Sequence, residues 1–286
     1  MNQPELDTDL TRREFVSAVG GLLASSALPT ASATKAGAGK KLERIGLELY
    51  TVRGEMKKNF GGTLARVART GYKEVEFAGY FGYSAKTVRA SLRQNGLTSP
   101  SSHIGFPVLG KDWDKTIEDA LVIGQRYLIC PWIDDKYRTL DGYKQVAGLF
   151  NKAGERAKAA GIQFGYHNHS YEFKPIQGRL PYDLLIEETD PALVVMQMDV
   201  FWMRNGGQDP LVYFRRYPGR FPSLHIKDMD AAGKMVDVGK GVIPWRAIFA
   251  RRELAGTKHI FVEHDEPKDP FASIRDSYRY LRSLEI

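Results

Sequence analysis

The feature that most constrains the fold of this 286-residue chain is a run of eight short apolar segments separated by helical patterns. Apolar and polar residues alternate within these segments, as they do in strands. The segments lie near residues 45–50, 73–77, 97–104, 127–131, 162–167, 193–199, 221–227 and 259–263. Eight strands alternating with helices predict an α/β fold, a (β/α)8 TIM barrel. A doubly wound open sheet is the alternative, but no glycine-rich dinucleotide turn follows the first strand.

Residues 1–33 have the pattern of a removable export signal. Twin arginines, Arg12 and Arg13, precede a small apolar run from Val16 to Leu28, and Ala-Ser-Ala at 31–33 offers a cleavage site. The run is shorter than the about 20 apolar residues of a membrane span. We therefore expect export to the periplasm by the twin-arginine (Tat) machinery, with no membrane anchor after cleavage. A charged amino-terminal helix is the alternative.

Residues 34–41 have the composition of a flexible linker, which places the expected barrel domain at 42–286. The formal net charge is +7, but the Lys and Arg residues are scattered and form no recognised nucleic-acid motif. We therefore expect a basic protein that does not bind nucleic acid. The single cysteine, Cys130, excludes an intramolecular disulfide, so stability must come from the core.

The last four strands each end on an inward-facing polar residue. These residues are His167, Asp199, His225 and Glu263. Because the carboxyl ends of parallel barrel strands share one rim, we expect the four side chains to converge there. Two imidazoles and two carboxylates suit one divalent ion, with Mn, Zn, Fe or Co favoured over Mg. Each residue alone has a structural explanation, such as a helix cap or an ion pair, so the prediction depends on their convergence.

The chain resembles the sugar phosphate isomerase/epimerase family of xylose isomerase-like TIM barrels, which includes ketose epimerases and inosose dehydratases. The resemblance covers essentially residues 42–286. It rests on residues 45–53, Tyr-His-Asn-His at 166–169, Met-Asp-Val-Phe-Trp at 198–202, His-Ile-Lys-Asp at 225–228, Gly239, Gly241, Trp245 and Val-Glu-His at 262–264. In that family Glu, Asp, His and Glu hold a divalent metal. The last three map onto Asp199, His225 and Glu263, whereas His167 replaces the first glutamate.

The resemblance implies a metal-dependent sugar isomerase or epimerase that acts by enolisation next to a metal-bound carbonyl. Ketose epimerases exchange protons between two glutamates, and His167 removes one of these. A metal-dependent lyase or dehydratase acting on keto sugars, inososes or 3-keto-glycosides is therefore the alternative. Glu263 is then both a metal ligand and a candidate base. His169 is a second proton-transfer candidate, and Lys227 either holds a developing oxyanion or makes a structural ion pair.

Further residues near the strand ends are suited to bind a small sugar or keto-sugar substrate. Candidates for hydroxyl recognition are Glu48, Tyr50, Glu76 and His103, and candidates for stacking on a sugar ring are Trp132 and Trp202. The glycine-containing segment 228–245 is expected to be a mobile lid. Two other classes stay open: a metal nuclease of the endonuclease IV type, for which six His are few, and a non-catalytic sugar-binding protein.

Overall fold

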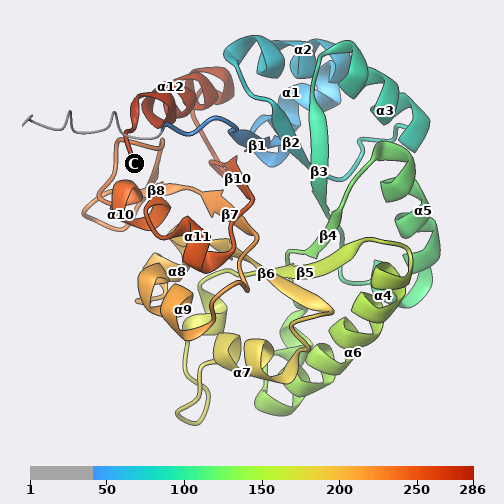
Figure 1. The fold of residues 1–286 in the computed structure, drawn as a ribbon, viewed down its shortest axis with the longest axis vertical. Helices are drawn as coiled ribbons and strands as arrows, with labels where there is room; N and C mark the ends of the chain where they lie inside the picture. The colour runs from blue at the N-terminus through green and yellow to red at the C-terminus, as the bar shows by residue number, and fades with distance from the viewer. Residues whose placement is uncertain (1–40) are drawn as a thin grey trace, which may run out of the picture. The chain divides into compact units, whose positions relative to one another are not determined.

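The computed structural model describes residues 41–286. Eight parallel strands close into a barrel in the order β1-β10-β7-β6-β5-β4-β3-β2, and helices surround them (Figure 1). This closed parallel barrel confirms the predicted (β/α)8 fold. The strands are β1 (Gly46–Glu48), β2 (Glu74–Ala78), β3 (Thr98–His103), β4 (Tyr127–Cys130), β5 (Gln163–His167), β6 (Val194–Asp199), β7 (Ser223–Ile226) and β10 (His259–Val262).

The helical elements alternate with these strands along the chain. The α-helices are α1 (Arg53–Lys58), α2 (Phe60–Thr70), α3 (Ala85–Gln94), α4 (Val108–Lys111), α5 (Trp113–Ile123), α6 (Leu140–Ala159), α7 (Pro181–Glu188), α8 (Val200–Asn205), α9 (Pro210–Arg216), α10 (Trp245–Phe249), α11 (Arg252–Ala255) and α12 (Pro270–Ser283). The 3-10 helices are η1 (Leu49–Val52), η2 (Asp135–Tyr137) and η3 (Tyr171–Phe173). Of the described helices, none is long and apolar enough to cross a membrane. The predicted signal at 1–33 and all but the last residue of the predicted linker at 34–41 lie outside the described residues.

The alternation in each strand builds the wall of the barrel. Outward residues such as Leu47, Phe164 and Leu224 are fully buried beneath the helices. On β5, for example, the rings of Phe164 and Tyr166 lie 5.2 and 5.4 Å from the ring of Phe150 on α6. Burial of this apolar face fixes the register, because a slip of one residue would turn every inward side chain outward.

Close approach of two strands requires a glycine at the start of β1. Gly46 pairs with Phe261 of β10, and a Cβ added to Gly46 would lie 2.5 Å from Cδ1 of the Phe261 ring. The ring therefore occupies space that any larger residue at position 46 would fill. This packing closes the interior below the polar residues of the site.

The first strand is shorter than the predicted segment 45–50. It ends at Glu48, whose carboxylate accepts a hydrogen bond from the backbone N–H of Tyr50 at 3.2 Å and caps the 3-10 helix η1. The chain turns at this cap, so Tyr50 does not share the inward face of Glu48 as the alternation predicted. Tyr50 instead stands at the rim, with 39% of its surface exposed.

The predicted lid, segment 228–245, contains a short hairpin of β8 (Asp228–Met229) and β9 (Met235–Val236). The buried Asp228 carboxylate accepts bonds from five N–H groups, those of Met229, Gly239, Gly241 and Ile243 and the Trp245 indole, at 2.8–3.3 Å. A Cβ at Gly241 would collide with this carboxylate. The two ends of the segment are thus tied to one anion, and its motion stays a prediction.

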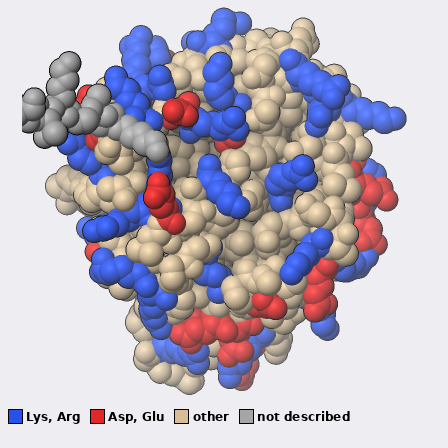
Figure 2. All heavy atoms as spheres, viewed as in Figure 1, with Lys and Arg blue, Asp and Glu red and all other residues tan. Residues whose placement is uncertain are grey.

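The charged side chains are dispersed over the surface. Figure 2 shows Lys and Arg spread across the face drawn, with Asp and Glu most numerous along its lower and right edges and in isolated spots elsewhere. The basic surface on this face therefore has no single continuous track, as the scattered positions in the sequence suggested.

Candidate active site

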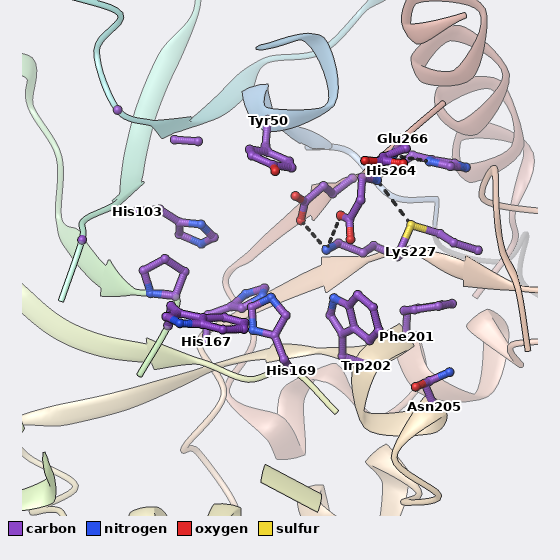
Figure 3. A pocket seen from close by; sticks show the side chains of 18 of the residues that line it. Tyr50, His103, His167, His169, Phe201, Trp202, Asn205, Lys227, His264 and Glu266 are labelled. Carbon is purple, nitrogen blue, oxygen red and sulfur yellow. Dashed lines mark hydrogen bonds and ion pairs between the residues drawn. The ribbon is translucent and has the colours of Figure 1, made fainter. Parts of the chain in front are cut away.

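A cavity of about 960 Å³ opens at the carboxyl ends of the strands. His103, His167 and His169 lie along one side of it, and Lys227 faces them next to two carboxylates (Figure 3). Five of the six histidines lie in or around this site, whereas His259 lies at the amino end of β10. Parallel barrel strands concentrate their polar ends at this rim, where active sites of such barrels occur.

The structure brings three of the four predicted metal ligands into one group. One ligand atom from each of Asp199, His225 and Glu263 lies within 4.8 Å of the other two. His167 belongs to a second such group with His103 and His225, and its Nε2 lies 3.7 Å from Oδ2 of Asp199. His167 therefore lies next to the group of Asp199, His225 and Glu263, but it is not a member of that group by the 4.8 Å criterion.

The amide of Gln197 on β6 determines which nitrogen of His167 carries a proton. Its NH2 group donates to Glu76 at 2.8 Å and to Ser223 Oγ at 3.0 Å, and a carboxylate can only accept. The amide oxygen therefore faces the imidazoles, at 2.7 Å from His103 Nε2 and 3.1 Å from His167 Nδ1. Both of these nitrogens must donate, which leaves the lone pair of His167 on Nε2, toward Asp199.

His167 is neutral as well as oriented. Burial, together with the nearby His225 and His103, holds the pKa of His167 well below its usual range. A neutral imidazole whose lone pair faces a carboxylate is repelled by it unless a cation lies between them.

Glu76 supports His225 from below the cavity. Its Oε2 lies 2.5 Å from His225 Nε2, and Oε2 of Glu263 lies 2.7 Å from the other ring nitrogen, Nδ1. Although burial acts against charge on the ring, the two carboxylates raise the pKa of His225 to about 9. Both ring nitrogens therefore carry protons in this arrangement. With Nε2–H held by Glu76, Nδ1 is the nitrogen that can exchange its proton for a metal beside Asp199 and Glu263.

Lys227 is the cation at the centre of the site. Its Nζ lies 3.1 Å from Asp199, 2.9 Å from Glu263 and 2.7 Å from Asp265. Although burial opposes it, this carboxylate cluster raises the pKa of Lys227 well above its usual value. In turn, despite burial, Lys227 and His225 hold the pKa of Glu263 well below its usual range. The sequence suggested two roles for Lys227, binding of a developing oxyanion or a structural ion pair. The structure shows the ion pairs.

These residues fit a divalent ion. Zinc ligands lie about 2.0–2.2 Å from the metal, which places neighbouring ligand atoms roughly 3 Å or slightly more apart. The 2.7 Å between His225 Nδ1 and Glu263 and the 3.7 Å between His167 Nε2 and Asp199 bracket that spacing. The Oδ2 atom of Asp199 also has no hydrogen-bond partner, only the ion pair with Lys227. The donor set can therefore hold a metal once Lys227 gives way.

Two buried nitrogen atoms beside the cavity have no partner among the described residues. They are Nδ1 of His169 and Nε1 of Trp202. Burial and the nearby Lys227 lower the pKa of His169 to about 3, so its ring is neutral. Both rings line the cavity.

The other predicted substrate residues divide into two groups. Tyr50, His103 and Trp132 line the cavity. Glu48 and Glu76 are fully buried beneath it and do not line it. The carboxyl of Glu48 has its pKa raised well above the usual value by burial and then by Glu76 and Glu263. On this side of the cavity, a substrate hydroxyl would therefore contact His103. Glu76 lies behind His103 and would not touch the substrate.

Three contributing residues were absent from the sequence-based site. Gln197 shares the inward parity of Asp199, a signal that was available. Asp265, which binds Lys227, lies two residues after Glu263. Glu172 is fully buried and accepts the backbone N–H of His169 at 2.9 and 3.1 Å, which fixes the turn that presents that ring. Its position in a short 3-10 helix gives no strand alternation from which to infer this role.

Known proteins resemble this chain over most of the barrel. The family model of the xylose isomerase-like TIM barrel matches residues 64–284. A sugar phosphate isomerase/epimerase from Parabacteroides distasonis is 30% identical, with a TM-score of 0.75 over 89% of this chain and 97% of that chain. An IOLI protein with a bound zinc atom is 12% identical over 82% of this chain and 95% of that chain, with a TM-score of 0.66, and shares the fold.

A curated relative is an inosose dehydratase from Lacticaseibacillus casei. It is 34% identical over 97 residues, which is 34% of this chain. The match spans about a third of that relative's length, 32%. The family-model match covers more than half of the chain and agrees with the closed barrel and with the polar cluster at its carboxyl rim. This chain therefore belongs to the xylose isomerase-like TIM barrel family.

Proposed function

We propose that the chain is a divalent-metal-dependent sugar isomerase/epimerase-like enzyme that acts by enolisation of a sugar or keto sugar. The observation that carries this proposal is the pairing of a neutral His167, with its lone pair on Nε2, and the Asp199 carboxylate 3.7 Å away. That arrangement favours a cation between the two atoms, next to Glu263 and His225. The residues that would hold the ion are His167, Asp199, His225 and Glu263.

When bound, a divalent ion would acidify the carbon next to a coordinated carbonyl and stabilise the anion that forms on the substrate. Glu263 would accept the proton, because it is the carboxylate that both lines the cavity and belongs to the ligand group. Paired with Lys227, however, Glu263 is a weak base. Transfer of the ammonium toward Asp265, already 2.7 Å away, would restore its basicity.

The neutral His169 would serve the second proton transfer. Its ring lines the cavity, its Nδ1 has no partner among the described residues, and Glu172 holds its backbone in place. Lys227 and Trp202 Nε1 would donate hydrogen bonds to substrate oxygens. The chain's residues thus supply a base, a second proton-transfer group and two donors around one cavity.

A lyase or dehydratase is the second candidate. The proton-transfer groups on the two sides of the site differ, with a carboxylate at the end of β10 and imidazoles at the end of β5. Such asymmetry suits abstraction of a proton by Glu263 and its delivery to a departing oxygen that the neutral His169 ring binds through a hydrogen bond. The inosose dehydratase relative supports this candidate over the aligned part.

The test is incubation of Mn-loaded or Zn-loaded protein with free sugars, 3-keto sugars and inososes in deuterated water, followed by NMR of the products. Deuterium at the carbon next to the carbonyl is expected. Loss of water or of an aglycone would identify the lyase, and retention of all substituents would identify the isomerase or epimerase. Glu263→Gln should abolish exchange, whereas Glu74→Gln, at the opposite end of β2 from the cavity, should retain it. Absence of exchange from every substrate by the folded, metal-loaded protein would overturn the proposal.

A further inference from the structure

Two exposed aromatic side chains stand at the mouth of the cavity, and one of them, Trp132, has its ring centroid 5.2 Å from that of His169. Tyr50 and Trp132 are 39% and 42% exposed, and both line the cavity. Tyr50 follows β1 and Trp132 follows β4, three strands away around the barrel. Within the described part of the chain, neither side chain makes a hydrogen bond or ion pair with Lys227 and its carboxylates. They are therefore free to serve a part of the ligand that does not react.

Each ring is backed by an arginine. The guanidinium carbon of Arg53 lies 4.0 Å from the centroid of the Tyr50 ring, and that of Arg138 lies 4.3 Å from the Trp132 ring. Neither arginine lines the cavity, although both rings do. Each guanidinium thus lies over a face of its ring without entering the cavity that the ring lines.

The arginines are themselves anchored. Arg53 donates to the carbonyls of Tyr50 at 2.9 Å and Asp265 at 2.6 Å. Arg138 donates to the carbonyl of Ile133 at 3.1 and 3.2 Å and pairs with Asp135 at 2.8 Å. Their donors are thus engaged with the protein. The two rings are therefore held in place before a ligand binds. Little conformational entropy is lost from these side chains on binding.

The wall of the cavity is divided by polarity around the rim. At the ends of β2, β3 and β4 the lining consists of Ala78, Ile104, Pro131 and Trp132, with two glycines and a single polar side chain, that of His103. Toward the other side it includes Asn205, Lys234, His264 and Glu266. A polyhydroxylated ring would find partners on the second side and few on the first. The first side instead suits an apolar group.

The cavity has room for both groups. Its volume of about 960 Å³ is near the upper end of the roughly 300–1,000 Å³ typical of small-molecule sites, and a single sugar ring would fill a small part of it. A guanidinium on one face draws electron density from an aromatic ring. The opposite face then stacks better on an electron-rich ring than on the C–H bonds of a second sugar.

We infer that the cavity contains a second subsite, at the ends of β2–β4 with Trp132 and Tyr50 as its platforms, for an aromatic group attached to the sugar. The ligand class is an aryl glycoside or a similar aryl-substituted sugar. This inference rests on the proposed function for the position of the sugar ring, at Lys227 and Trp202. The aromatic group would extend from that ring toward Trp132.

The experiment compares binding of phenyl and methyl glucopyranosides, as both anomers, to the full chain loaded with Mn²⁺; these glycosides have no carbonyl to enolise, so no turnover interferes. Calorimetry should show that the phenyl glycoside binds roughly tenfold more tightly, the size expected for burial and stacking of one ring. Trp132→Ala should remove this gain. The matched control is Tyr83→Ala, which removes a 45% exposed ring outside the cavity lining and should leave the gain intact.

If Trp132→Ala does not fold, a measurement on the protein with Trp132 intact tests the same inference. With a diamagnetic Zn²⁺ load, NMR of the phenyl protons should show upfield shifts caused by the rings they stack on. Equal affinity for both glycosides, binding of neither, or a gain that survives Trp132→Ala would overturn the subsite.

The two proposals fail separately. A phenyl-specific gain without deuterium exchange on any sugar would leave the subsite standing and refute the enolisation. Exchange on free sugars without a phenyl-specific gain would do the reverse.

Discussion

The Nε2 atom of His167 lies 3.7 Å from Oδ2 of Asp199, and neither atom has a hydrogen to give the other. This relationship follows from the Gln197 amide, whose oxygen accepts a hydrogen bond from Nδ1–H of His167 and so leaves Nε2 without a proton. Asp199→Asn should therefore weaken Mn²⁺ or Zn²⁺ binding at least a hundredfold, because it removes the negative charge from the ligand group. Titration calorimetry with metal-free protein measures the change. Asp183→Asn, which alters a carboxylate paired with Arg216 away from the cavity, should leave the metal affinity unchanged; equal weakening by both variants would contradict the assignment.

Glu76 should control metal affinity without touching the metal. Glu76→Gln removes the charged partner of His225 Nε2, and loss of such a partner typically lowers metal affinity about 10–100-fold. The control is Glu74→Gln, two residues earlier on the same strand, where the carboxylate binds Arg44 and His259 instead. Both proteins should be checked for folding by circular dichroism. Unchanged affinity in Glu76→Gln would show that His225 needs no such support.

Metal binding should release a proton. His225 carries protons on both ring nitrogens, and its pKa is raised to about 9, with burial opposing and Glu76 and Glu263 favouring the charged ring. At pH 7 the ring is thus charged before the metal arrives, and coordination through Nδ1 must expel about one proton. Calorimetry in buffers of different ionisation enthalpy counts the protons released. A count near zero would mean that the ion does not bind His225.

Lys227 should stabilise the protein when no metal is bound. Lys227→Met leaves Asp199, Glu263 and Asp265 without their shared cation, and loss of one partner from a buried ion pair costs about 3–5 kcal/mol in the free energy of unfolding. Urea unfolding with and without Mn²⁺ measures this cost, which the metal should largely offset.

The matched control for this variant is Lys240→Met. Lys240 pairs with Asp237 and Asp276 but is 58% exposed, so its removal should cost about 1 kcal/mol or less. A metal-free Lys227→Met protein as stable as the unaltered chain would refute the role of Lys227 as a substitute cation.

Asp228 should hold the hairpin segment in place. Asp228→Asn removes a buried charge that accepts five N–H bonds, and bonds to charged groups contribute about 1.5–3 kcal/mol each, so a loss of at least about 3 kcal/mol is expected. Hydrogen exchange should accelerate over residues 229–243. In Asp230→Asn, which alters a half-buried carboxylate bound to two N–H groups at the hairpin tip, both effects should be small. Unaltered exchange in Asp228→Asn would contradict the anchor.

The strands and their inward faces were predictable because their signals are local. Alternation assigns each side chain to one face of a strand, and the buried outer face leaves only one register. For this reason strand alternation alone predicts that His167, Asp199 and His225 lie at the rim. Of these three, only His167 lines the cavity, whereas Asp199 and His225 are buried beside it; Lys227 and Glu263, one residue beyond β7 and β10, line it.

The depth of each inward side chain along the barrel axis was not predictable in the same way. The stagger of neighbouring strands decides the layer in which an inward residue lies, and alternation carries no information about stagger. Glu76 and His103 have the same parity, yet one is sealed below the cavity and the other lines it. The position of Tyr50 depended on a turn capped by Glu48, and the partner of Lys227 came from a loop residue, Asp265. Such contacts arise only when the barrel has closed.

The Asp228 anchor has a consequence for how this barrel can change. Because one carboxylate secures both ends of the segment, the tip between them is held by its own turn around Asp230. Gly233, Lys234 and Met235 on that tip nevertheless face the cavity. Residues 231–234 can therefore be exchanged to admit other ligands, whereas Met235 has to stay, because its sulfur accepts the backbone N–H of Asp265, a partner of Lys227.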